Sequence, residues 1–134
     1  MLNRMLGLAI VAALALTAGH ARAASGLSTT FDACTGRARG AIEQAACLSS
    51  EAERQDRRLN QAYKQLQGRL DSTGKARLVA AQRSWRQWRE SEGALETALY
   101  DSNPVDNLQQ ARNDAERLRV RADQLEAYLR LVEL

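Results

Sequence analysis

The sequence has little histidine, cysteine or proline, and the scarcity of histidine excludes whole classes of protein. Its single histidine is His20, and its two cysteines are Cys34 and Cys47. Because residues 1–23 have the form of a removable export signal, we expect the exported chain to contain no histidine. Such a chain has no Ser-His-Asp triad, no Cys-His pair and no histidine-ligated zinc. We therefore expect a protein that is not an enzyme and that holds no metal and no cofactor.

Residues 1–23 predict a secretory signal peptide. Arg4 gives the positive start, an apolar stretch runs from Met5 to Ala18, and Ala21-Arg22-Ala23 has the A-x-A form of a cleavage site. The apolar stretch is shorter than the ~20 residues that a spanning helix needs. We therefore expect cleavage before Ala24, no stable membrane insertion afterwards, and a product that is periplasmic or secreted from a bacterium.

Export changes the charge balance. The whole sequence has 19 basic and 16 acidic side chains, a net charge of +3. Arg4 and Arg22 leave with the signal, which removes no acid, so 17 basic side chains remain against 16. A nearly neutral chain gives no support to nucleic-acid binding, which needs a basic face. The arginines and glutamates that recur along residues 83–96 indicate a solvated helix face of mixed charge, and we expect a protein partner.

The two cysteines predict one disulfide. Two thiolates alone do not make a zinc site, and an exported protein meets an oxidising compartment. A Cys34–Cys47 bond would close a loop of roughly 14 residues, which contributes about 3 kcal/mol in the chain-entropy model. It would tie the N-terminal segment 24–40, expected to be irregular apart from a turn near Phe31, to the first long helix.

The rest of the chain, residues 41–134, predicts one all-α domain. Helix-forming residues dominate, and Pro104 is the only proline. Three apolar stripes recur in steps of three and four, the pattern of helices packed at shallow angles. The breaks between them are Asp71–Gly74 and Asn103-Pro104, where Asn103 is a predicted N-cap. We predict an elongated antiparallel three-helix bundle with a disulfide-tethered N-terminal segment. The stripes are Ala41, Ala45, Leu48, Ala52, Gln55, Leu59, Ala62 and Leu66; Leu78, Ala81, Trp85, Trp88, Glu92, Leu95 and Leu99; and Leu108, Ala111, Ala115, Leu118, Ala122, Leu125, Leu129 and Val132.

The hairpin between the second and third stripes has a predictable register. A turn near residue 102 pairs positions whose numbers sum to about 204, as in any antiparallel helix hairpin. Glu92, which interrupts its apolar stripe, then lies opposite Arg112. Since a buried carboxylate needs a partner, we expect an ion pair there, with Arg89 as a second partner.

The two tryptophans allow two interpretations. Trp85 and Trp88 lie three residues apart and share one helix face, with Trp88 opposite Ala115 in the predicted register. They could form a carbohydrate-stacking platform or a binding hot spot, but their heptad spacing favours a place in the core.

Both tryptophans lie in Gln82–Glu92, which reads QRSWRQWRESE. The run resembles the Q-R-x-W-x-x-aromatic-R-[DE]-x-E core of the LprI-like lysozyme-inhibitor domain, a small helical domain of bacterial cell envelopes. The resemblance covers roughly Cys34 to Leu125 and implies a non-enzymatic lysozyme inhibitor. The motif and core residues that carry it are Leu59, Tyr63, Gln82, Trp85, Trp88, Arg89, Glu92, Arg121 and Leu125, with Cys47 and Leu70 beside them.

The sequence departs from that family at one feature. Family members commonly carry a cysteine just after the last glutamate of the motif and another early in the last helix. Here the first position is Gly93, and the second falls within residues 111–113. The register places residue 93 opposite residue 111, so the chain resembles an atypical member in which one disulfide has been replaced.

The connection Tyr100–Asp106 is the candidate binding site. It offers an aromatic ring, two acids and a rigid proline at one end of the predicted rod, and it could enter a lysozyme cleft or be an ordinary turn. Its candidate partner-binding residues are Tyr100, Asp101, Ser102, Asn103 and Asp106. Other functions stay open: an immunity or scaffold protein that binds an envelope partner through a helix face, or an envelope chaperone. Monomer and dimer are both compatible with the stripes.

Overall fold

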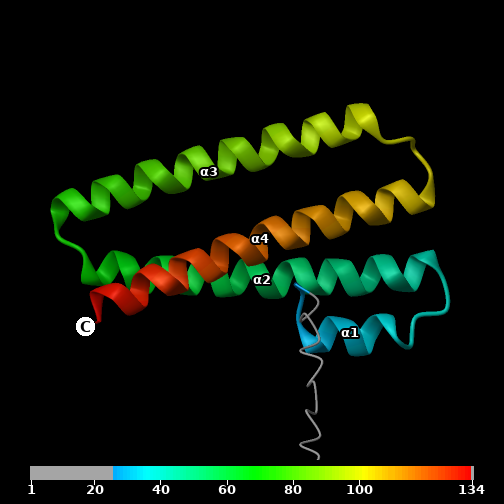
Figure 1. Ribbon diagram of the computed structural model, residues 1–134, viewed down its shortest axis with the longest axis horizontal. Helices are drawn as coiled ribbons and strands as arrows, with labels where there is room; N and C mark the ends of the chain where they lie inside the picture. Colours follow the sequence, from blue (N-terminus) through cyan, green and yellow to red (C-terminus); the bar gives the residue numbers. More distant parts are fainter. Residues whose placement is uncertain (1–25, 134) are drawn as a thin grey trace, which may run out of the picture.

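The computed structural model describes residues 26–133, which form four helices (Figure 1). They are α1 (Thr29–Thr35), α2 (Ala41–Arg69), α3 (Ser72–Leu99) and α4 (Pro104–Val132). The three long helices are antiparallel rods joined by short connections (Figure 1). The predicted all-α fold is therefore confirmed, while the predicted signal peptide lies outside the described residues. None of the four helices has the length and apolarity that a membrane crossing requires.

Side-chain caps fix where α3 and α4 begin. The Asp71 carboxylate accepts a hydrogen bond from the backbone N–H of Gly74 at 2.7 Å, at the start of α3. Asn103 does the same for the N–H of Asp106 at 3.0 Å, with Pro104 as the first residue of α4. These caps satisfy backbone donors that have no partner within the helix. The predicted cap and proline start of the last helix are confirmed.

The N-terminal segment is more regular than its composition predicts. Ser28 caps α1 by accepting a hydrogen bond from the N–H of Phe31 at 3.1 Å. The Phe31 ring is buried in a cluster with Leu48 and Ala115, from α2 and α4. Burial of this aromatic residue and the cap together hold a short helix where the sequence indicated only a turn.

One covalent link and one set of hydrogen bonds hold α1 on α2. The predicted Cys34–Cys47 disulfide is present, with 5.7 Å between the Cα atoms. The fully buried Glu51 carboxylate accepts hydrogen bonds from the Ser28 N–H at 2.9 Å and the Ser28 hydroxyl at 2.6 Å. Burial would raise the pKa of Glu51, but these bonds, with those from Gln55 and Arg54, outweigh it and lower that pKa.

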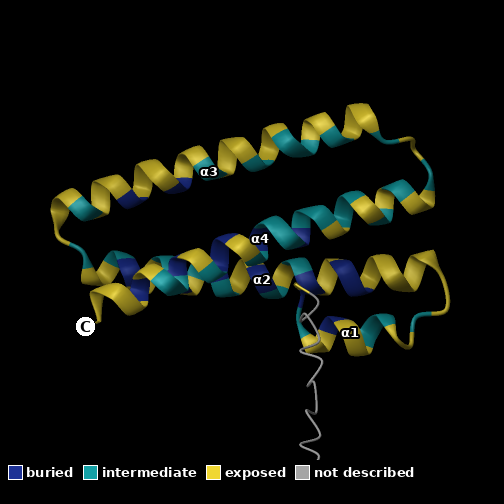
Figure 2. Cartoon of the chain, in the orientation of Figure 1, coloured by how far each residue is buried: buried dark blue, intermediate teal, exposed yellow. Residues whose placement is uncertain are grey.

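The main core lies between α2 and α4. The buried surface in Figure 2 follows these two helices, whereas α3 is exposed along most of its length. Only Leu78 and Gln82 of α3 are buried, both in its first half. A three-helix bundle is therefore not confirmed: α3 joins the core near its start, and its second half contributes no buried residue. The core residues are Leu59, Ala62, Leu66, Leu78, Leu118, Ala122, Leu125 and Leu129.

Candidate functional site

The contact between α3 and α4 is largely polar. Arg89 of α3 donates two hydrogen bonds to the Asp114 carboxylate, at 2.7 and 2.6 Å. Arg117 of α4 likewise donates two to Glu96, at 2.8 and 3.0 Å. Asp114 raises the pKa of Arg89 and Arg117 lowers the pKa of Glu96, in both cases against the opposing effect of burial. Two bidentate ion pairs thus hold the second half of α3 beside α4.

The predicted ion pair between Glu92 and Arg112 is absent. Within residues 26–133, Glu92 has no cationic nitrogen within 4.0 Å, and the Arg112 guanidinium lies over the Phe31 ring, 5.2 Å from its centroid. The register itself is nearly as predicted, because Arg89 meets Asp114. The prediction failed because it placed no ordered element beside that face of the last helix. In the structure α1 lies there, and the Arg112 guanidinium packs over the Phe31 ring of α1 instead of pairing with Glu92.

The motif Gln82–Glu92 attaches α3 to the core. Gln82 is buried, and its Oε1 accepts a hydrogen bond from Arg121 Nε of α4 at 3.0 Å. The guanidiniums of Arg89 and Arg121 lie 5.8 and 5.9 Å from the centroid of the Trp85 ring, within cation–π distance. Burial lowers the pKa of Arg121. Of the other motif and core residues, Leu59 and Leu125 are buried and Tyr63 packs against them.

The predicted place of Trp88 in the core is wrong. Its side chain is 48% exposed, and further along the same stripe Leu95 is 51% and Leu99 72% exposed. Heptad spacing identifies the apolar face of a helix but not whether another element covers that face. Trp88 instead lines a shallow groove of about 270 Å³ between α3 and α4, here called the α3–α4 groove, with Trp85 and the exposed Val120.

The predicted binding connection, Tyr100–Asp106, lies at one end of the molecule (Figure 1) and is called the tip below. Asn103 and Asp106 are occupied in holding its shape: Asp106 Oδ2 accepts hydrogen bonds from the Asp101 N–H at 3.1 Å and from Asn103 Nδ2 at 2.7 Å. Tyr100 is half-buried, whereas the side chains of Asp101 and Ser102 are exposed.

Two exposed apolar residues lie at the tip, one just before it and one within it. Leu99, at the end of α3, is 72% exposed, and Val105, in the first turn of α4, is 74% exposed. Leu99 was not among the predicted binding residues, because it belongs to a heptad stripe that was expected to be covered. Its place in the last turn before the predicted connection was the available signal. The tip thus presents an acid and a hydroxyl between two apolar side chains.

Comparison with known proteins assigns the chain to a family. A family model described as Lysozyme inhibitor LprI matches residues 34–125, from the first cysteine through the motif and the tip into α4. The chain belongs to the LprI lysozyme inhibitor family. The predicted resemblance is therefore confirmed, and LprI inhibitors are not enzymes. No curated protein and no solved structure matches the chain.

This LprI-family chain holds α3 to α4 without a disulfide between them. A Cβ atom added at Gly93, the position of the expected family cysteine, would have no atom within 4 Å apart from its chain neighbours and its own helix backbone. The Arg89–Asp114 and Glu96–Arg117 pairs lie on either side of that position. Within residues 26–133, no three His, Cys, Asp or Glu side chains gather as metal ligands would.

Proposed function

We propose that this chain is an exported inhibitor that binds a lysozyme-type muramidase and that its tip enters the enzyme's cleft. The observation that carries this proposal is the composition of the tip: exposed Leu99 and Val105 on either side of exposed Asp101, at the end of a rod. Apolar side chains supply affinity when they are buried in a partner. A carboxylate between them can pair with basic groups around the cleft.

The cap at the tip supports the same proposal. Asn103 and Asp106 hydrogen-bond to each other and to the backbone, and Pro104 restricts the chain between them. A loop whose shape is fixed before binding loses little conformational entropy when it enters a partner. The α2–α4 core would serve as the rigid support. Residues 1–23 would direct the chain to the periplasm or out of the cell.

A lysis assay with the exported, oxidised chain tests the proposal. The panel consists of animal c-type and g-type lysozymes and a bacterial muramidase. We expect stoichiometric inhibition of at least one enzyme, and at least a tenfold weaker inhibition by the double variant Leu99→Ser, Asp101→Ala. The matched control is Leu131→Ser with Glu53→Ala, which removes a similarly exposed leucine and an exposed acid from positions outside the tip and the grooves. Asp106→Ala is unsuitable alone, because it also removes the hydrogen bonds from Asp101 and Asn103 that hold the shape of the tip.

Two results would contradict the proposal. Absence of inhibition across the panel would reject general lysozyme inhibition. Inhibition that survives in the tip variant at full strength would place the binding surface elsewhere on the molecule.

The alternative is an immunity or scaffold protein that binds an envelope partner through a helix face. The exposure of Trp88 and Val120 in the α3–α4 groove favours this alternative, because an exposed tryptophan is a common anchor of interfaces. Trp88→Ala separates the two functions: it should weaken partner binding under the alternative and leave inhibition unchanged if the tip alone contacts the enzyme.

A further inference from the structure

A second groove lies on the opposite flank of α3. Tyr63 of α2 forms one wall, and Val79, Gln82, Arg83 and Arg86 of α3 form the rest, around a volume of about 250 Å³. This α2–α3 groove shares no lining residue with the tip or with the α3–α4 groove. Because pockets for drug-sized ligands begin near 300 Å³, its size suits a ligand smaller than a drug molecule.

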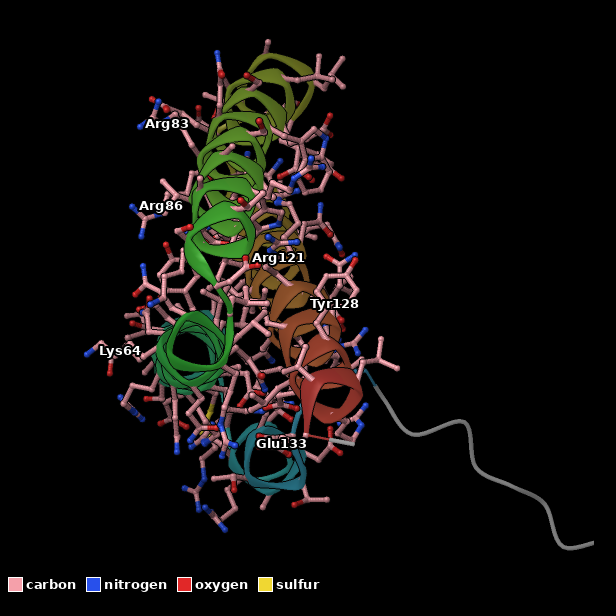
Figure 3. All side chains as sticks on the ribbon, turned by 90° about the vertical axis from the view of Figure 1, so that its left-hand side faces the viewer. Lys64, Arg83, Arg86, Arg121, Tyr128 and Glu133 are labelled. Atoms are coloured by element: carbon pink, nitrogen blue, oxygen red, sulfur yellow. A yellow bond between two sulfur atoms is a disulfide. The ribbon has the colours of Figure 1, made fainter. Side chains whose placement is uncertain are left out.

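The arginines of the α2–α3 groove have no ion-pair partner. Among residues 26–133, no carboxylate lies within 4.0 Å of the guanidinium of Arg83 or Arg86, in contrast to the bidentate pair of Arg89 one turn further along. Glu90, one turn beyond Arg86, makes no ion pair with it. Figure 3 shows Arg83, Arg86 and Lys64 projecting from the same side of the molecule. This flank therefore carries uncompensated positive charge.

A buried donor lies beside these cations. Gln82 is only 5% exposed, and its Oε1 already accepts a hydrogen bond from Arg121. Its Nε2 has no hydrogen-bond partner among the described residues. Buried amide donors are nearly always paired, with water or a ligand atom where no protein group is in reach, and Gln82 lines the groove through which such an acceptor can enter. The acceptor that two guanidiniums and an amide would share is an anionic oxygen.

We propose that the α2–α3 groove binds a carboxylated sugar. Arg83 and Arg86 would bind the carboxylate, the Gln82 amide would donate to one of its oxygens, and the Tyr63 ring with Val79 would contact the sugar face. An aromatic and an aliphatic wall favour an organic anion over inorganic phosphate. The choice of muramic acid among such sugars rests on the proposed function, because it is the carboxylated sugar of the polymer that muramidases cut. In the intact wall that carboxyl group is amide-linked to the stem peptide, so the groove would bind glycan from which the peptide has been removed.

Direct binding tests the groove without any lysozyme. In an NMR titration of the ¹⁵N-labelled exported chain, N-acetylmuramic acid is compared with N-acetylglucosamine, which lacks the carboxylate. We expect saturable shifts of the Gln82 side-chain N–H₂ and of the Arg83 and Arg86 Nε–H signals with the acid, and none with the neutral sugar. Arg83→Gln with Arg86→Gln should weaken binding at least tenfold.

A charge-matched control keeps the experiment specific. Lys75→Gln with Arg77→Gln removes the same charge from exposed positions of the same helix, outside the groove, and should leave binding unchanged. The proposal is overturned by no saturable shift up to ~50 mM sugar, a range that would still detect very weak binding, or by equal losses in both double variants. Inorganic phosphate that binds as tightly as the acid would overturn the assignment to a sugar. None of these outcomes depends on whether the tip inhibits a lysozyme.

Discussion

The α2–α4 contact and the α3–α4 contact hold their helices by different means. Between α2 and α4, large apolar side chains such as Leu59, Leu118 and Leu125 are almost fully buried. Between α3 and α4, ion pairs such as Arg89–Asp114 take their place, and both partners stay about one third exposed. An apolar contact stabilises in proportion to the area removed from water, whereas a partly exposed ion pair contributes little net free energy. The core should therefore set global stability, and α3 should be able to separate locally.

The apolar stripe of α3 shows where the two kinds of contact meet. Leu78 is buried, Trp85 is half-buried, and Trp88, Leu95 and Leu99 are increasingly exposed towards the tip. The apolar stripe of α3 continues beyond the part of the helix that packs into the core. Apolar side chains that remain available at this end are the ones that the proposed binding surfaces use.

The largest expected effect comes from truncation in the core. Leu125 is fully buried between α2 and α4, so Leu125→Ala should lower the free energy of unfolding by about 3–4 kcal/mol. Leu99→Ala removes the same atoms from a side chain that is 72% exposed and should cost less than about 0.5 kcal/mol. Urea unfolding monitored by circular dichroism measures both. Similar losses in the two variants would mean that the end of α3 is covered after all.

Loss of the disulfide should affect the α1–α2 side alone. Cys34→Ser with Cys47→Ser opens a loop of roughly 14 residues and should cost about 3 kcal/mol. Amides of α1 should then exchange faster with solvent, because only non-covalent links are left among the described residues: the Glu51 hydrogen bonds and the apolar contacts of Leu27 and Phe31. Hydrogen exchange monitored by mass spectrometry checks this. Faster exchange in α3 rather than in α1 would refute the expectation that the disulfide stabilises only the attachment of α1 to α2.

Sequence patterns predicted the elements well and their environment less well. The helix start at Asn103, the disulfide and the approximate hairpin register follow from local chemistry or from sequence spacing. By contrast, α3 begins at Ser72, inside the predicted break Asp71–Gly74. The short helix α1 depends on the burial of Phe31 by residues from two other helices, which no local pattern contains. The position of Arg112 over that ring was unpredictable for the same reason.

The candidate sites were predictable only in part. The tip could be located, because a proline with neighbouring acids between two apolar stripes indicates a connection. The sequence did not show that Asp106 and Asn103 are engaged in capping while Leu99 and Val105 stay exposed. The α2–α3 groove was not predicted. A helix that carries mixed charges does not show from its sequence which arginines pair with carboxylates in the folded chain.

Lowering the pH should weaken the attachment of α1 to α2, because it protonates Glu51. Its pKa is lowered in the folded chain, so its contribution is complete above the ordinary value of 4.5 and is lost as the pH falls through the folded pKa. Glu51→Gln should cost about 1–2 kcal/mol at pH 7 and flatten the loss of stability below pH ~4.5. Glu53→Gln, in an exposed pair with Arg57, is the matched control. Thermal unfolding between pH 7 and pH 3 should give parallel curves for the control and the parent chain, and a shallower one for Glu51→Gln.

The smallest expected effect on global stability comes from an ion pair between α3 and α4. A double-mutant cycle on Arg89→Ala and Asp114→Ala should give a coupling of about 0.5–1 kcal/mol, because both side chains are partly exposed. In hydrogen exchange, however, the second half of α3 should lose protection while α2 and the buried part of α4 keep theirs, since no buried side chain anchors that half. Uniform loss of protection across α2, α3 and α4 would show one cooperative bundle, and α3 could then not move independently when a partner reaches the α3–α4 groove or the tip.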